Sequence, residues 1–191
     1  MYRIYMLSFF CLVFSLTASA QSKMPAAGIM ANAYRQATKE HKNIFVIFHA
    51  SWCVWCHKMD SCISKSSVKN YFDSNYVIVH LTVQEKDSTK NTPGAFNYLK
   101  RFHGEQSGLP FWVITDNRGA WMGDSYIRKE GQTKDSVGVN MGCPAEDNEV
   151  KAFCELLKKT SQMNEQQLTE IGRLFSQNKP RPVKKKKGKN S

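Results

Sequence analysis

Two cysteines separated by two residues are the most reactive feature of this 191-residue sequence. Cys53 and Cys56 enclose Val54 and Trp55, a spacing of about one helical turn that lets the two sulfurs meet at the start of a helix. A helix start presents free backbone N–H groups and the positive end of the helix dipole, and both stabilise a thiolate. The pair is therefore suited to dithiol–disulfide exchange, with Cys53 as the nucleophile and Cys56 as the resolving thiol.

The residues after the pair leave two other interpretations open. His57 and Lys58 could add positive charge that favours the Cys53 thiolate. With His57 included, however, the segment is also a CxxCH sequence, the attachment site of c-type haem. A third interpretation is a static disulfide between Cys53 and Cys56 in a binding or chaperone module.

Three further cysteines lie downstream of the pair. Cys62 is expected to act as a small buried hydrophobic residue. Cys143 and Cys154 could form a structural disulfide that fixes a loop to a helix. Their spacing of eleven residues is too wide for the second close pair that a four-cysteine zinc site needs. We therefore expect neither a metal nor a cofactor.

The chain around the pair alternates between helical and strand patterns. Residues 44–48 are five consecutive apolar residues, typical of a strand buried on both faces, and the cysteine pair follows directly. Two antiparallel strands are expected to end the sheet, joined by a turn at 116–119. Residues 128–141 are predicted to be a surface loop, and residues 161–164 a break between the last two helices. The predicted helices are 27–41, 96–102, 148–160 and 165–175, with one more starting at the cysteine pair, and the predicted strands are 44–48, 76–83, 111–115 and 120–127.

This order of elements predicts an α/β fold with a central mixed β-sheet and helices on both faces. Right-handed crossovers place the end of the first strand near the middle of such a sheet. The functional site is therefore expected where that strand meets the cysteine pair.

Two segments carry a resemblance to a known family. Residues 45–59, FVIFHASWCVWCHKM, and Gly108-Leu109-Pro110-Phe111 resemble the thioredoxin superfamily, particularly its exported bacterial members with a WCxxC signature. The resemblance implies a thioredoxin-like fold with a cis peptide bond before Pro110, which packs against the active disulfide. It also implies that Leu109 pairs with the substrate backbone and that Trp52 packs beside the motif.

We further expect a monomer that exchanges disulfides with protein thiols and receives electrons from an upstream redox donor. One position departs from the pattern, because thioredoxins often bury an acid where this chain has Ile47. His49, His57 or a water could take over the proton transfer to Cys56. The sequence leaves the redox direction open, although a reductase or isomerase is favoured over a strong oxidant.

The N-terminal residues predict export. Arg3 precedes an apolar run over 4–16, and Ala18-x-Ala20 is typical of a cleavage site, so residues 1–20 are predicted to be a signal peptide. The alternative is an uncleaved membrane anchor. We expect a thioredoxin-like domain over 21–178 in the periplasm or outside the cell.

The formal charge of +11 is concentrated at the C-terminus. The last thirteen residues contribute +7, which leaves +4 for the rest of the chain, so the charge does not indicate nucleic-acid binding. Residues 179–191 are predicted to be a basic disordered tail. Its charge could adhere to an anionic membrane or polysaccharide surface.

Overall fold

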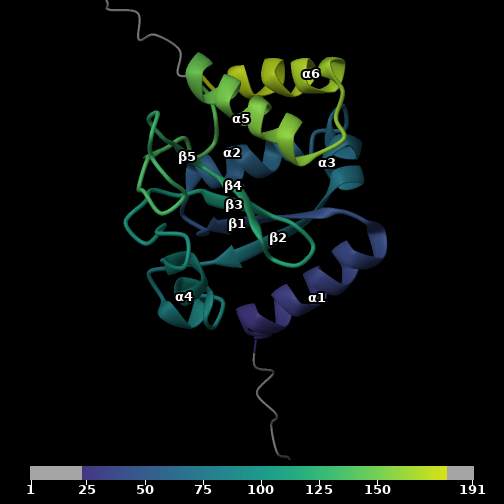
Figure 1. The fold of residues 1–191 in the computed structure, drawn as a ribbon. Helices are drawn as coiled ribbons and strands as arrows, with labels where there is room; N and C mark the ends of the chain where they lie inside the picture. The colour runs from purple at the N-terminus through teal and green to yellow at the C-terminus, as the bar shows by residue number, and fades with distance from the viewer. Residues whose placement is uncertain (1–22, 180–191) are drawn as a thin grey trace, which may run out of the picture.

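The computed structural model describes residues 23–179, which form a sheet covered by helices (Figure 1). The predicted signal peptide and all of the predicted basic tail except Lys179 lie outside the described residues. In chain order the elements are α1 (Ala26–Glu40), β1 (Asn43–His49), α2 (Val54–Ile63), α3 (Lys69–Asn75), β2 (Tyr76–Thr82), a short 3-10 helix (Ser88–Lys90), α4 (Ala95–Lys100), β3 (Phe111–Thr115), β4 (Trp121–Asp124), β5 (Tyr126–Ile127), β6 (Val139–Asn140), α5 (Asp147–Thr160) and α6 (Glu165–Ser176).

The main sheet is mixed, with the strand order β2-β1-β3-β4. β1 pairs in parallel with β2 and antiparallel with β3, and β3 pairs antiparallel with β4. Residues 44–48 have no exposed surface, as the unbroken apolar run predicted. The central position of β1 is therefore confirmed.

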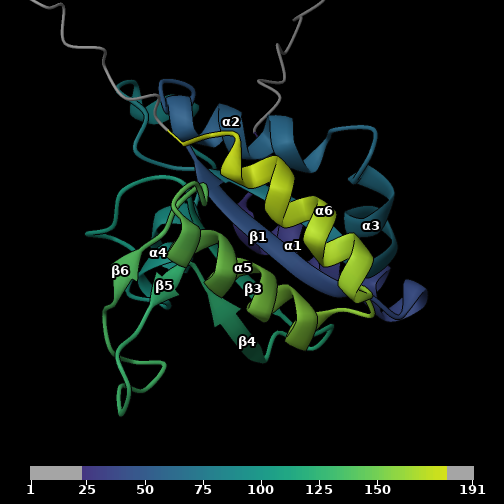
Figure 2. The same cartoon turned by 90° about the horizontal axis from the view of Figure 1, so that it is seen from above.

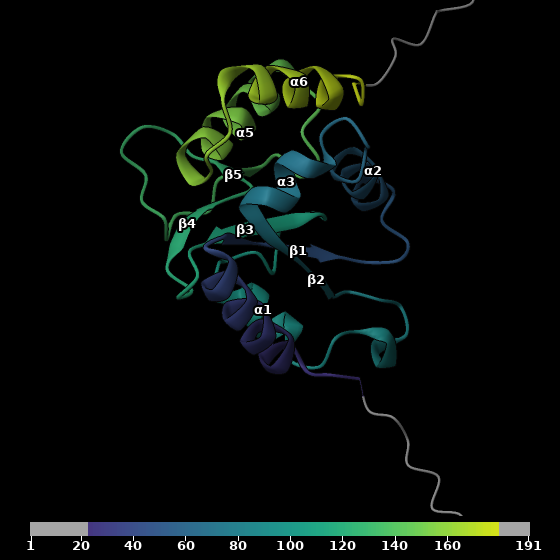
Figure 3. The same ribbon diagram turned by 90° about the vertical axis from the view of Figure 1, so that its right-hand side faces the viewer.

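Helices cover both faces of the sheet, because successive side chains of a strand point to opposite sides. Phe45 and Ile47 pack with residues of α2, α3, α5 and α6, whereas Ile44, Val46 and Phe48 pack with residues of α1 and α4. Figure 3 shows the two layers on either side of the sheet, and Figure 2 shows α5 and α6 next to each other above it. No helix within residues 23–179 is long and apolar enough to span a membrane.

The structure corrects the predicted fold in two places. α3 was not predicted, since it is short and only Phe72 is buried on it. The predicted strand 120–127 is interrupted at Ser125, whose backbone N–H donates to the carbonyl of Trp112. Its last two residues form β5 and pair with β6 in a separate sheet.

The prediction of a surface loop over 128–141 is also wrong at its C-terminal end. Val139 and Asn140 form β6, and Met141 is buried. Two paired residues are too few to give a strand pattern in the sequence.

An ion pair fixes the start of this loop. The Asp124 side chain is 1% exposed and accepts two hydrogen bonds from the guanidinium of Arg128, at 2.7 and 2.8 Å. Arg128 Nε also donates to the carbonyl of Ser136 at 2.8 Å. The guanidinium thus connects the end of β4 with the long loop that leads to β6.

Candidate active site

The cysteine pair lies between the end of β1, an inner strand of the sheet, and the first turn of α2. Cys53 and Cys56 form a disulfide with their Cα atoms 5.2 Å apart. Cys53 is the N-cap of α2, and its sulfur accepts a hydrogen bond from the backbone N–H of Cys56 at 3.1 Å. The same N–H, together with the helix dipole, would stabilise a Cys53 thiolate once the disulfide is reduced.

An apolar rim surrounds the disulfide. Cys53 is 4% exposed and Cys56 is 1% exposed, because Ala50 and Leu109 pack against them. Next to the covered sulfurs, three large apolar side chains are exposed: Trp52, Val54 and Trp55. These three side chains, called the rim below, are adjacent in the chain to Cys53 and Cys56.

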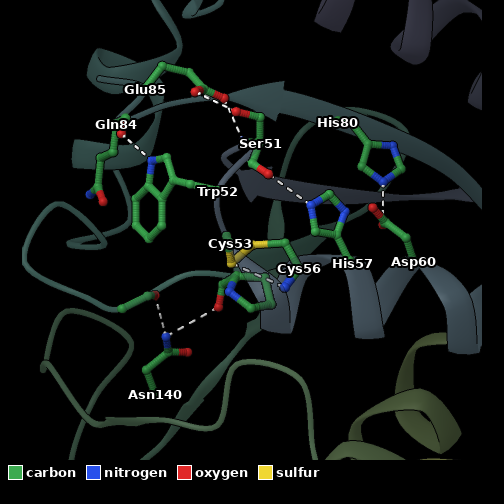
Figure 4. Close-up of a disulfide and its surroundings, with 12 residues drawn as sticks. Ser51, Trp52, Cys53, Cys56, His57, Asp60, His80, Gln84, Glu85 and Asn140 are labelled. Carbon is green, nitrogen blue, oxygen red and sulfur yellow. Dashed lines mark hydrogen bonds and ion pairs between the residues drawn. A yellow bond between two sulfur atoms is a disulfide. The ribbon is translucent and has the colours of Figure 1, made fainter. Parts of the chain in front are cut away.

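The segment before the disulfide is held by the loop after β2 (Figure 4). Trp52 Nε1 donates to the carbonyl of Gln84 at 2.9 Å. The Glu85 carboxylate accepts from the backbone N–H of Ser51 at 2.6 Å and from its hydroxyl at 2.8 Å. These bonds, from the Ser51 backbone first and its hydroxyl second, lower the pKa of Glu85. Trp52 is thus anchored at its nitrogen while its ring stays exposed.

Sequence reasoning missed Gln84 and Glu85, although a signal for them existed. They follow a strand that runs parallel to β1, and parallel neighbours end at the same edge of a sheet. Polar residues directly after β2 were therefore candidates for contact with the residues after β1.

The loop before β3 lies against the disulfide. The peptide bond between Leu109 and Pro110 is cis, as the resemblance implied. Leu109 packs against Cys53 and Cys56. Of the residues expected to bind substrate, Leu109 thus touches the cysteine pair, Pro110 follows it directly in the chain, and Trp52 lies on the rim.

Asn140 connects β6 to this cis-proline loop (Figure 4). Its Nδ2 donates to the carbonyls of Gly108 at 2.6 Å and Pro110 at 3.3 Å. Its Oδ1 accepts from the backbone N–H of Gly142 at 3.1 Å. Asn140 therefore connects the loop beside the disulfide, through Nδ2, with the segment after β6, through Oδ1. No local sequence signal identifies it, because its partners lie about thirty residues away.

His57 and Lys58 are positioned by groups other than the two sulfurs. His57 Nε2 lies 2.9 Å from the carbonyl of Ser51, which can only accept a hydrogen bond, so this nitrogen carries the proton. Lys58 Nζ lies 3.9 Å from the centroid of the Trp55 ring. Within the described residues, neither side chain donates a hydrogen bond to Cys53 or Cys56.

Ile47 is fully buried against α2, at the position where the family often has an acid. His49 lies two residues further along β1, so its side chain leaves the same face of the sheet. Burial first, and the nearby His80 second, lower the pKa of His49. The His49 ring packs edge-on against His80, whose Nε2 lies 2.8 Å from Asp60 Oδ1. The use of His49 in proton transfer stays a prediction.

The expected disulfide between Cys143 and Cys154 is wrong, since both cysteines are free thiols in the structure. Cys154 lies within α5, and its sulfur is 3.5 Å from the carbonyl of Leu168 on α6. Cys143 precedes α5 and lies instead near Cys62, on the side facing α2. The two sulfurs point toward different neighbours because α5 begins between the two cysteines in the chain.

Metal-ligating side chains are dispersed over the described part of the chain. Among residues 23–179, no three side chains of His, Cys, Asp or Glu gather as a metal site requires.

Part of the chain, including the cysteine pair, matches a known protein family. Residues 28–117 match the family model described as thioredoxin-like. These residues run from α1 to just past β3, so they include both Cys53–Cys56 and the cis-proline loop. No curated protein matches the sequence.

Similar solved structures have low sequence identity. They include a disulphide isomerase from Xylella fastidiosa Temecula1, at 16% identity over 87% of this chain and 97% of that chain, with a TM-score of 0.46. The oxidised C-terminal domain of Neisseria meningitidis DsbD is 16% identical over 72% of this chain and 97% of that chain, with a TM-score of 0.43. A thioredoxin from Thermus thermophilus is 18% identical over 71% and 83%, with a TM-score of 0.42.

Proposed function

We propose that this protein, whose residues 28–117 match the thioredoxin-like family model and which carries a Cys53–Cys56 disulfide, is an exported oxidoreductase that exchanges disulfides with protein thiols. One observation carries the proposal. The Cys53 sulfur caps α2 and accepts a hydrogen bond from the backbone N–H of Cys56. Leu109 of the cis-proline loop packs against it, and both segments lie within the residues that match the thioredoxin-like family model. This is the environment that makes a cysteine nucleophilic at neutral pH.

The reaction starts from the reduced pair. The Cys53 thiolate attacks one sulfur of a substrate disulfide, which forms a mixed disulfide and releases a substrate thiolate that takes up a proton. Cys56 then loses its proton and attacks the Cys53 sulfur, which breaks the mixed disulfide and releases the second substrate thiol. The protein ends as the Cys53–Cys56 disulfide of this structure, having given two electrons to the substrate.

The rim favours protein substrates over small thiols. Trp52, Val54 and Trp55 are exposed around sulfurs that are themselves nearly covered, so productive approach buries apolar surface of the partner. Leu109 packs against the two cysteines next to the cis bond, and in the proposed reaction its backbone would pair with an extended substrate segment. An upstream redox donor would then reduce the Cys53–Cys56 disulfide again.

A disulfide-exchange assay tests the proposal. The purified protein should accelerate reduction of insulin by dithiothreitol, and Cys53→Ser should fall to the rate of the reagent alone. Cys56→Ser should accumulate a mixed disulfide on Cys53, because the resolving thiol is gone. Cys154→Ser is the matched control, since Cys154 packs against α6, and it should keep the wild-type rate.

Two outcomes would contradict the proposal. Equal rates for the wild type and Cys53→Ser would support the static disulfide of a binding module instead. For the exported location, N-terminal sequencing of the protein from its native cell envelope should find a chain that starts near Gln21. Full-length protein confined to the cytoplasm would refute export.

A further inference from the structure

Cys62 and Cys143 bring their thiols together at the end of α2 that lies away from Cys53. The side-chain amide of Asn178 contacts both, with Nδ2 at 3.2 Å from the Cys62 sulfur and 3.5 Å from the Cys143 sulfur. The distance between the sulfurs cannot exceed these two distances taken together. Both cysteines are buried in the same apolar cluster, and both are free thiols.

The pKa of the Cys143 thiol also reflects its closeness to Cys62. Burial raises the pKa of the Cys143 thiol to about 12, and Cys62 is the next largest cause. Burial also raises the pKa of Cys62, although the hydrogen bond from Asn178 acts in the opposite direction. Each thiol is thus the other's neighbour and stays protonated at neutral pH.

We propose that Cys62 and Cys143 are a second dithiol site, which low-molecular-weight disulfides such as oxidised glutathione convert into an intramolecular disulfide. The site is separate from the exchange reaction of Cys53 and Cys56 and does not depend on it. The bond would join the C-terminal part of α2 to the segment before α5.

A pocket borders this site on the Cys143 side. It has a volume of about 320 Å³ and lies between Trp55, Leu109 and Cys143, with Asn140 and Glu149 also in its wall. The other side of the thiol pair is covered by the turn after α6, where Asn178 bonds to both sulfurs. Lys179 holds this turn through Nζ contacts of 3.0 Å to Glu146 and 3.4 Å to Asp147. Cys143 is therefore the thiol that a small disulfide meets first.

Oxidised glutathione is the oxidant in the proposed reaction. The Cys143 thiol loses its proton and attacks one sulfur of oxidised glutathione, which forms a mixed disulfide and releases one glutathione thiolate. Cys62 then loses its proton and attacks the Cys143 sulfur, which forms the Cys62–Cys143 bond and releases the second glutathione. Two protein thiols are oxidised, and one glutathione disulfide is reduced to two thiols. Since both thiols are protonated at neutral pH, the reaction should quicken as the pH rises.

The bond would also act on the pocket beside Trp55 and Leu109. Cys143 follows Gly142, whose N–H bonds to Asn140, and Asn140 holds the cis-proline loop. Pulling Cys143 toward Cys62 therefore displaces a wall of the pocket beside Trp55 and Leu109.

The test uses the full-length chain with Cys11, Cys53, Cys56 and Cys154 replaced by Ser, so that only the two proposed partners remain. After incubation with oxidised glutathione at mildly alkaline pH, both thiols should resist alkylation under denaturing conditions. The protein mass should fall by two hydrogens, and peptide mapping should find the Cys62 and Cys143 peptides joined. Adding Cys62→Ser should leave Cys143 as a glutathione adduct without a cross-link.

A parallel incubation in urea separates folding from chance encounter. If the fold brings the sulfurs together, the ratio of cross-link to glutathione adduct should drop severalfold in the unfolded chain. The proposal is overturned if the folded protein keeps both thiols, if it yields only glutathione adducts, or if the cross-link forms equally well in urea. Because the test variant has Ser in place of Cys53 and Cys56, none of these results bears on the exchange activity.

Discussion

Asn140 provides the sharpest test of how the site is held together. Replacing it with Ala removes the amide that bonds to the carbonyls of Gly108 and Pro110 and to the N–H of Gly142. The cis-proline loop would then lose its connection to β6. The expected consequence is a loop that spends less time against the Cys53–Cys56 pair, and therefore a slower exchange reaction.

The size of the effect follows from the three bonds. A hydrogen bond contributes roughly 0.5–1.5 kcal/mol net, and freed groups near the surface recover part of this from water. We therefore expect Asn140→Ala to lower the free energy of unfolding by about 1–3 kcal/mol. If about 1.4 kcal/mol of the loss falls on the arrangement that binds the transition state, kcat/KM for a peptide disulfide drops by about tenfold.

A matched control separates loss of stability from loss of positioning. Asn75 also bonds through both ends of its amide, to the carbonyl of Tyr71 and to the N–H of Gln162, each at 2.8 Å. It connects α3 to the segment before α6, away from the disulfide. Asn75→Ala should therefore reduce stability in urea to a similar degree and leave kcat/KM unchanged. Equal exchange rates in the two variants would refute the positioning role of Asn140.

Two further predictions concern the buried ion pair of Asp124 with Arg128 and the largely buried imidazole of His49. Arg128→Met leaves the Asp124 carboxylate buried without its cation and should lower the free energy of unfolding by about 3–5 kcal/mol in urea titrations. Adding Asp124→Asn should recover most of that loss, and a double variant as unstable as the single one would contradict the account. Burial holds the pKa of His49 below its ordinary value of 6.5, so the unfolded chain binds a proton more readily and stability falls as the pH drops below that value. His49→Gln should flatten this part of the pH dependence between about pH 7 and pH 5, whereas an unchanged slope would show that other groups cause it.

The sequence by itself determined the reactive pair and most of the longer helices and strands. The apolar run over 44–48 predicts a buried central strand, and the structure confirms it. The helices over 148–160 and 165–175 also agree with α5 and α6 to within about a residue. These features could be predicted because strand burial, helix periodicity and the spacing of Cys53 and Cys56 are all written in neighbouring residues. The cis bond before Pro110 was accessible through the resemblance alone.

The tertiary structure alone decided which distant side chains meet. Glu85 binds Ser51, Asn140 binds the cis-proline loop, and Cys143 lies beside Cys62 instead of Cys154. None of these pairings follows from spacing along the chain, because each joins segments that only the packing of the sheet and its helices brings together. The reactive sulfurs were thus encoded locally, whereas the groups that hold, cover and neighbour them depend on the completed fold.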